Sequence, residues 1–222
     1  VLPTDKRFVT SLIDRFQPAW KKVSEFLGAE TQDQYKKRGE DILRRVMAHP
    51  GPLAGKAVKI NMDLPYYWIS EEANLILCGK LDWLEYLASE DAVHIIDFKT
   101  GVGEESVDSL QLPIYHLLAH NCQTREVKKA SYWYIARDDM PSQKNLPDLD
   151  KSKNLVMKIG KEMKLARQLE RFKCPEGEGG CKHCLPLEKI LQGQATFVGM
   201  GSYKTDLYAN FENSSAPVSE IL

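Results

Sequence analysis

Three β-type segments follow one another in the middle of the chain and constrain its fold more than any other feature. Apolar and polar residues alternate between residues 56 and 69, a β-prone run spans residues 75 to 86, and another spans residues 92 to 99. Alternation of this kind is typical of strands with one face in a core. A helical pattern over residues 104 to 119 and a strand pattern over residues 128 to 136 follow. This order predicts a mixed α/β fold.

Helical patterns flank this central region on both sides. Residues 5 to 27 and residues 32 to 47 carry apolar side chains at helical spacing, with Pro18 as a point where the first helix can kink. Residues 138 to 150 form a polar stretch with the composition of a loop, and a basic helix is predicted over residues 155 to 172. The cysteine-containing segment and a polar tail come last.

Composition is typical of a soluble globular protein, with 43% apolar and 27% charged residues. The sequence contains no apolar run of about 18 residues, so no membrane-spanning segment is predicted. The net charge of -1 gives no overall signal for nucleic acid. Basic residues nevertheless gather on two predicted helices, where they either bind phosphates or form solvated helix faces. They are Lys36, Lys37, Arg38, Arg44 and Arg45 on one helix, and Lys158, Lys161, Lys164, Arg167 and Arg171 on the other.

Two acidic residues and a lysine stand where two predicted strands change from apolar to charged. Asp82 ends one such run, and Asp97 and Lys99 end the next. Strand residues two apart point to the same face, so Asp97 and Lys99 lie together, and Asp82 joins them if the strands form a hairpin. Solvated charges at strand ends are the alternative interpretation.

A divalent metal and an attacking water suit this group of residues. Mg²⁺ prefers oxygen ligands, which Asp82, Asp97 and the backbone carbonyl of Phe98 can supply. Lys99 would stabilise the charge of a phosphorane, or orient and help deprotonate the water. These residue types therefore predict the cleavage of a phosphodiester bond.

The residues Gly79-x-x-Asp82, Asp97-x-Lys99-Thr100-Gly101 and Gln111-x-x-x-Tyr115 resemble, in this order, the motifs of the PD-(D/E)XK nuclease superfamily. Within it they are most similar to the RecB-like nuclease module of helicase–nucleases. The resemblance implies a restriction-endonuclease-like αβββαβ core with a mixed central sheet flanked by helices, plus a C-terminal helix and a cysteine-rich segment.

The resemblance also implies roles for single residues. Asp82 and Asp97 would bind Mg²⁺ or Mn²⁺, and Lys99 would be the catalytic lysine. Gln111 and Tyr115, which lie on one face of the predicted helix, would hold the site or the DNA backbone. A core tyrosine and a surface glutamine are the alternative interpretation of these two residues.

RecB-like modules carry a histidine on an early helix and an early cysteine, and this sequence contains neither. Leu43 occupies the place equivalent to the histidine, and Glu40 is a candidate replacement ligand, although an exposed helix charge is the favoured interpretation. Both missing features belong to the N-terminal end of the family pattern. The chain is therefore predicted to be truncated at its N-terminus.

Three of the five cysteines, Cys174, Cys181 and Cys184, lie close together late in the chain. An odd count with this clustering favours a cytoplasmic protein with a metal site over a secreted disulfide framework. The resemblance suggests a 4Fe-4S cluster, and Zn²⁺ with a water, Cys122 or an upstream residue as the fourth ligand is an alternative. A metal-free, reduced trio is a third. Cys78 and Cys122 are predicted to be small buried core residues.

Other motifs carry no activity by themselves. His94, His116 and His120 have no matching serine or cysteine nucleophile in the sequence, so core or surface roles are predicted for them. No linker divides the chain, which predicts a single RecB-like nuclease domain over residues 1–222.

Within this domain we expect a helical N-terminal part over residues 1–50 and a catalytic core over residues 51–140. The basic helix, cysteine segment and tail would occupy residues 141–222. The expected function is a metal-dependent deoxyribonuclease, an exonuclease of a helicase–nuclease system for DNA repair or recombination. It would act on single-stranded or unwound DNA with a fused or associated helicase. The alternative is a non-catalytic DNA-binding or scaffolding module that retains the fold.

Overall fold

The structure is a computed structural model of the chain. It describes residues 10–24, 29–101, 103–174, 176–177, 180–201 and 204–209, without the side chains of residues 23 and 29–31. Residues 210–222 of the predicted polar tail lie outside the described residues.

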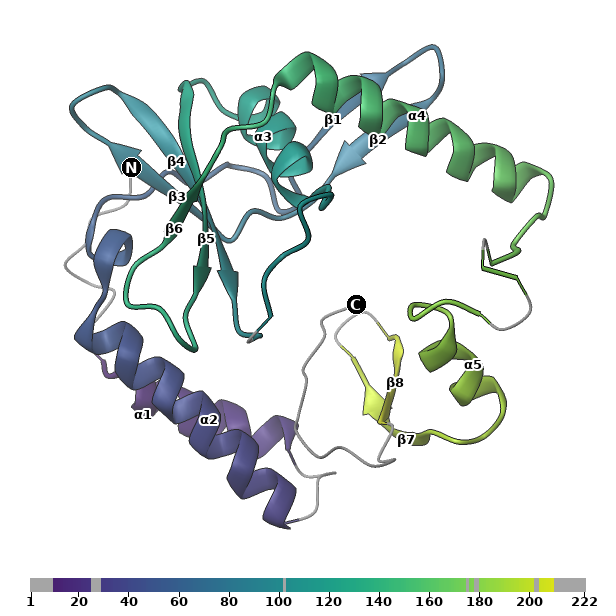
Figure 1. Cartoon of the computed structure of the whole chain (residues 1–222). Coiled ribbons are helices and arrows are strands. Elements are labelled where there is room, and N and C mark those ends of the chain that lie inside the picture. Colours follow the sequence, from purple (N-terminus) through teal and green to yellow (C-terminus); the bar gives the residue numbers. More distant parts are fainter. Residues whose placement is uncertain are drawn as a thin grey trace.

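A mixed four-stranded sheet forms the centre of the molecule, as expected (Figure 1). Its strands lie in the order β3 (Trp83–Leu87), β4 (Ala92–Lys99), β5 (Val127–Tyr134) and β6 (Ser142–Lys144). β4 is antiparallel to β3 and parallel to β5, and β6 returns antiparallel to β5. Every residue of β4 from Ala92 to Asp97 is buried, which explains why this strand is apolar before its charges except at His94.

Helix α3 (Gln111–Cys122) connects the two parallel strands and packs against the sheet. Its other side contacts α4 (Leu149–Gln168) and the hairpin of β1 (Tyr66–Ser70) and β2 (Leu75–Cys78). Because α3 lies between two layers, its buried residues are not confined to one narrow stripe.

Two helices, α1 (Leu12–Val23) and α2 (Ala29–Ala48), precede the sheet and pack against each other. Pro18 lies inside α1 without ending it. Gly39 allows their close approach, because a Cβ atom there would lie 2.8 Å from the ring of Phe16. A short 3₁₀-helix, η1 (Gly51–Ala54), follows. None of the helices that the structure describes is long and apolar enough to cross a membrane.

The segment after α4 contains α5 (Leu185–Leu191) and a hairpin of β7 (Thr196–Met200) and β8 (Asp206–Ala209). Figure 1 shows these elements set apart from the central sheet. The sequence had indicated only a cysteine segment and a polar tail here.

Several expected boundaries are wrong. Between residues 58 and 65 the chain is not a strand, and the run over residues 75–86 divides into β2 and β3, which belong to different sheets. The chain must leave one sheet before it enters the other, and Gly79 allows this close to Leu118, where a Cβ atom would lie 3.0 Å away. β6 interrupts the predicted polar loop.

The two isolated cysteines and two helix starts also differ from expectation. Cys78 is exposed and Cys122 only half-buried, so neither is a buried core residue. Helix α3 starts at Gln111, and Pro113 is accommodated in its first turn, where its missing N–H has no intrahelical partner to lose. Helix α4 starts six residues earlier than predicted, where the Asp148 side chain accepts a hydrogen bond of 2.8 Å from the Lys151 N–H.

Candidate active site

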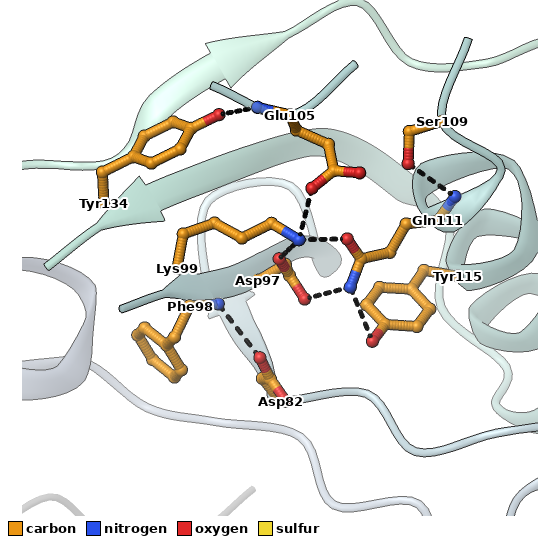
Figure 2. Close-up of polar contacts among 9 residues, drawn as sticks. All are labelled: Asp82, Asp97, Phe98, Lys99, Glu105, Ser109, Gln111, Tyr115 and Tyr134. Carbon is orange, nitrogen blue, oxygen red and sulfur yellow. Dashed lines mark hydrogen bonds and ion pairs between the residues drawn. The ribbon is translucent and has the colours of Figure 1, made fainter. Parts of the chain in front are cut away.

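The acids and the lysine meet at the end of β4, where this strand extends beyond the end of its neighbour. Trp83 pairs with Ile96, so residues 97 to 99 continue past β3 while the other edge of β4 remains paired with β5. Figure 2 shows Asp97 and Lys99 on one face of the strand with Gln111 and Tyr115 approaching from α3. The structure thus brings together the residues that the sequence singled out.

Asp97 is almost completely buried, with 2% of its surface exposed. Its Oδ1 accepts a hydrogen bond of 2.8 Å from Gln111 Nε2, and its Oδ2 lies 3.1 Å from Lys99 Nζ in an ion pair. That Oδ2 is also buried without a hydrogen bond of good geometry from any described residue. Burial, aided by the negative charge of Asp82, raises the pKa of Asp97 to about 6 despite the neighbouring ammonium of Lys99.

Lys99 is surrounded by three acceptors. Its Nζ lies 3.1 Å from Asp97 Oδ2 and 2.8 Å from Glu105 Oε2, and it donates a hydrogen bond to Gln111 Oε1. Burial lowers the pKa of the Lys99 ammonium, but its interactions with Glu105 and Asp97 outweigh this and keep the pKa above its ordinary value. Lys99 is therefore a positive charge at neutral pH.

Gln111 connects the strand to the helix. It is the first residue of α3, its Nε2 also donates to the Tyr115 hydroxyl at 3.1 Å, and its backbone N–H donates to Ser109 Oγ at 3.3 Å. One amide thereby fixes the carboxylate of Asp97 and the ammonium of Lys99 relative to each other. The expected four-residue spacing places Gln111 and Tyr115 on the same helix face, as Figure 2 shows.

Asp82 completes the group from the exposed side. Its Oδ2 accepts a hydrogen bond of 3.0 Å from the backbone N–H of Phe98. The N–H and carbonyl of one strand residue point to the same edge, so the Phe98 carbonyl also faces the edge on which Asp82 lies. The Phe98 side chain lies against Trp133 instead, with ring centroids 5.8 Å apart.

These residues fit a hard divalent cation. Oδ2 of Asp97 is buried and, beyond its ion pair with Lys99, accepts no well-aligned hydrogen bond from the described residues. The pKa of Asp97 is raised by burial and by a second carboxylate, and all candidate ligands are oxygen atoms. A cation between Asp82 and Asp97 would offset both the burial of charge and the repulsion between the two acids.

Glu105 lies near the site without any signal in the sequence, and Arg38, named only as part of a basic helix face, also reaches it. Glu105, on the loop before α3, pairs with Lys99, and its backbone N–H donates to the Tyr134 hydroxyl at 2.8 Å. Arg38 of α2 donates to the Thr100 carbonyl at 2.6 Å and ties the N-terminal helices to the end of β4. Glu40 instead accepts a hydrogen bond from the Gln17 side chain and lies 3.5 Å from Arg44.

The three late cysteines form a second candidate metal site. Cys174, Cys181 and Cys184 place their sulfur atoms within 4.8 Å of one another, with Cys181 and Cys184 3.6 Å apart. Backbone hydrogen bonds from Cys184 and His183 lower the pKa of Cys181. The hydrogen bond between the Cys181 and Cys184 side chains raises the pKa of Cys184 to about 11. Such a trio fits a thiophilic cation. Cys122 is not in this group, and its Sγ contacts the Tyr66 carbonyl at 3.5 Å.

One histidine lies in an arrangement that the sequence did not reveal. His94 of β4 lies between Glu85 of β3 and Ser131 of β5, 2.8 Å from each through its two ring nitrogens. Ser131 is only 1% exposed, so a substrate cannot reach its hydroxyl. Of the core and surface roles predicted for the histidines, the structure gives His94 the core role, and a serine partner does exist in the fold.

A family model described as the PD-(D/E)XK nuclease superfamily matches residues 3–186 of the chain. No curated protein and no solved structure shows a significant match.

Proposed function

The chain belongs to the PD-(D/E)XK nuclease superfamily, and we propose that it is a metal-dependent deoxyribonuclease that hydrolyses the phosphodiester bonds of DNA. The observation that carries this proposal is the buried carboxylate of Asp97, which the structure surrounds with Lys99, Gln111 and a second acid. This combination supplies ligands for a cation and a fixed positive charge at one sheet edge.

In this proposal Asp82, Asp97 and the Phe98 carbonyl hold Mg²⁺ or Mn²⁺. The bound cation would lower the pKa of a water and neutralise charge on the phosphoryl oxygens. Lys99 adds a positive charge beside the phosphate as negative charge develops during attack by water. Gln111 fixes the side chains of Lys99 and Asp97 relative to each other, and a hydrogen bond to Tyr115 holds Gln111 in place.

We further propose that the protein works as the exonuclease of a helicase–nuclease system. The ordered RecB-like motifs support this assignment, and single-stranded or unwound DNA delivered by a fused or associated helicase would be its substrate. Cys174, Cys181 and Cys184 would hold a structural Zn²⁺ or, with one further ligand, a 4Fe-4S cluster.

The test is a cleavage assay on end-labelled single-stranded DNA with Mg²⁺ and with EDTA. Asp97→Asn should abolish cleavage without a loss of fold. Asp91→Asn is the matched control, because Asp91 is an exposed aspartate in the turn of the same β3–β4 hairpin. Cleavage that persists in Asp97→Asn or in EDTA would contradict the proposal.

A non-catalytic DNA-binding module is the second candidate. It is favoured by the engagement of Lys99 with three protein acceptors, which matches the three N–H donors of an ammonium group. DNA binding without cleavage by wild type and Asp97→Asn alike, over a series of divalent metals, would support this alternative.

A further inference from the structure

A pocket lies directly beside the candidate metal site and shares one residue with it. The cavity measures about 380 Å³, and Asp82 is part of its wall. The same carboxylate accepts the hydrogen bond from the Phe98 N–H at the end of β4. A ligand in this pocket would therefore lie next to the phosphate on which the candidate site acts.

The pocket exists because two chain segments separate between two fixed points. The Val58 N–H bonds to the Leu84 carbonyl at 2.8 Å, and the Gly79 N–H bonds to the Pro65 carbonyl at 3.0 Å. Between these bonds, residues 59–64 bow away from residues 80–83. This stretch is the one whose apolar alternation had predicted a strand.

The lining combines apolar side chains with two lysines and two carboxylates. The apolar lining includes Val58, Ile60, Met62, Leu81 and Trp83. The alternating side chains thus line a pocket in place of a sheet face. Ile60 and Leu81 also pack against the hydrophobic core, which anchors the floor of the pocket.

Two lysines, Lys59 and Lys80, belong to the lining and are exposed. Asp63 is the second carboxylate of the wall. A ligand with a flat, apolar face and an anionic group matches apolar side chains beside lysines. The volume lies within the range of pockets that hold small ligands.

We infer that this pocket is a subsite for one nucleotide of the DNA strand that is cut, namely a nucleotide flanking the cleaved phosphodiester bond. Its base packs against the apolar wall around Met62, and its phosphate lies near Lys59 and Lys80. This inference rests on the proposed nuclease function and adds a position-specific contact to it. Such a contact tolerates any base, because every base offers a flat face.

The experiment uses a set of single-stranded oligonucleotides, each with one abasic position at a different distance from the cleavage point. Wild type should lose about tenfold in kcat/KM at one position that flanks the cut, and much less elsewhere. Met62→Ala should remove this dependence on position. It should also lower kcat/KM for the unmodified oligonucleotide by a similar factor. Met62 is 36% exposed, so the substitution should leave the fold intact.

The charge is tested with a matched pair of double variants. Lys59→Ala/Lys80→Ala should raise KM about tenfold and reduce the slope of log KM against log salt by about one to two. Lys151→Ala/Lys153→Ala, two exposed lysines at the start of α4, removes the same charge away from the pocket and should change KM less than about threefold. Equal changes in KM in the two double variants would overturn the inference.

The outcome for the subsite is separable from that for the nuclease function. An abasic series without a position effect, in an enzyme whose cleavage depends on Asp97, overturns the subsite and leaves the function standing. If no DNA is cut, fluorescence anisotropy with labelled oligonucleotides of the same abasic series measures binding directly. A position effect there, lost in Met62→Ala, supports the pocket, and its absence overturns it.

Discussion

The acidic site at the end of β4 and the cysteine trio after α4 both gather metal-type ligands, but they are held in different ways. Asp97 is buried within the central sheet, and side chains from a strand, a loop and a helix fix Lys99 beside it. The cysteines are half-buried in a turn closed by short-range bonds, on a segment that Figure 1 shows apart from the sheet. The fold thus organises the first site by itself, whereas a bound metal would be needed to fix the second.

Removing the positive charge of the first site should have the largest effect. Lys99→Met keeps the length of the side chain, and cleavage should fall about 10²–10³-fold because one preorganised charge is lost. Single-turnover rates measure this directly. Lys128→Met, on the exposed surface of β5, should cleave at the wild-type rate. If the two variants behave alike, Lys99 has no role in the reaction.

Disruption of the second site should leave the first one working. Cys181→Ser and Cys184→Ser should lose the metal that copurifies with wild type, measured by elemental analysis. Cleavage of short oligonucleotides should stay within about threefold of wild type, because the trio stands apart from the sheet. Cys78→Ser should retain the metal, since Cys78 lies outside the trio. A loss of cleavage as large as that in Lys99→Met would show that the two regions are coupled.

Asp97 should also limit the stability of the folded protein, whereas the half-buried cysteines should not. Its pKa in the folded protein, about 6, lies above its ordinary value of 3.8. Folding therefore disfavours its ionised form, a cost that is fully present above pH 6 and disappears as the pH falls toward 3.8. Asp97→Asn should raise Tm without metal by roughly 3 °C at pH 7.5. The gain should shrink at pH 4.5, and a destabilised variant at pH 7.5 would contradict this account.

His94 should make the sheet sensitive to mild acid, by a smaller amount. Burial lowers its pKa below the ordinary 6.5, although Glu85 opposes the shift. A depressed histidine pKa contributes stability that is present above pH 6.5 and lost as the pH falls below it. His94→Gln should therefore lose less unfolding free energy between pH 7.5 and pH 5 than wild type, by at most about 1 kcal/mol. Urea unfolding at pH 7.5 and pH 5 measures the unfolding free energy of both proteins. If that free energy depends on pH identically in wild type and His94→Gln, His94 is not the cause.

The sequence predicted best where one physical cause dominated. The run over residues 92–99 is β4, because burial on both faces favours apolar residues up to Asp97, with His94 as the polar exception. The region from residue 58 to residue 65 was misread because apolar alternation also suits a segment that lines a pocket. Periodicity shows that side chains face an apolar surface, and not which surface it is.

The missed site residues depend on contacts that no local pattern contains. Glu105 reaches Lys99 only because the loop before α3 folds over the sheet edge, and Ser131 reaches His94 only because β5 lies parallel to β4. Gln111 and Tyr115 could be predicted since their four-residue spacing on a helix is itself local information. Contacts between acidic and basic residues that loops separate in the sequence can be identified only from the folded structure.

The most direct test of the central claim is the dependence of the single-turnover cleavage rate on Mg²⁺ concentration in wild type and Asp82→Asn. If the two acids hold the cation, Asp82→Asn should need at least about tenfold more Mg²⁺ for half its maximal rate. Asp150→Asn, an exposed aspartate on α4, should give the wild-type curve. A rate that is independent of Mg²⁺, or identical curves for wild type and Asp82→Asn, would contradict the assignment of this edge of the sheet as the metal site of a nuclease.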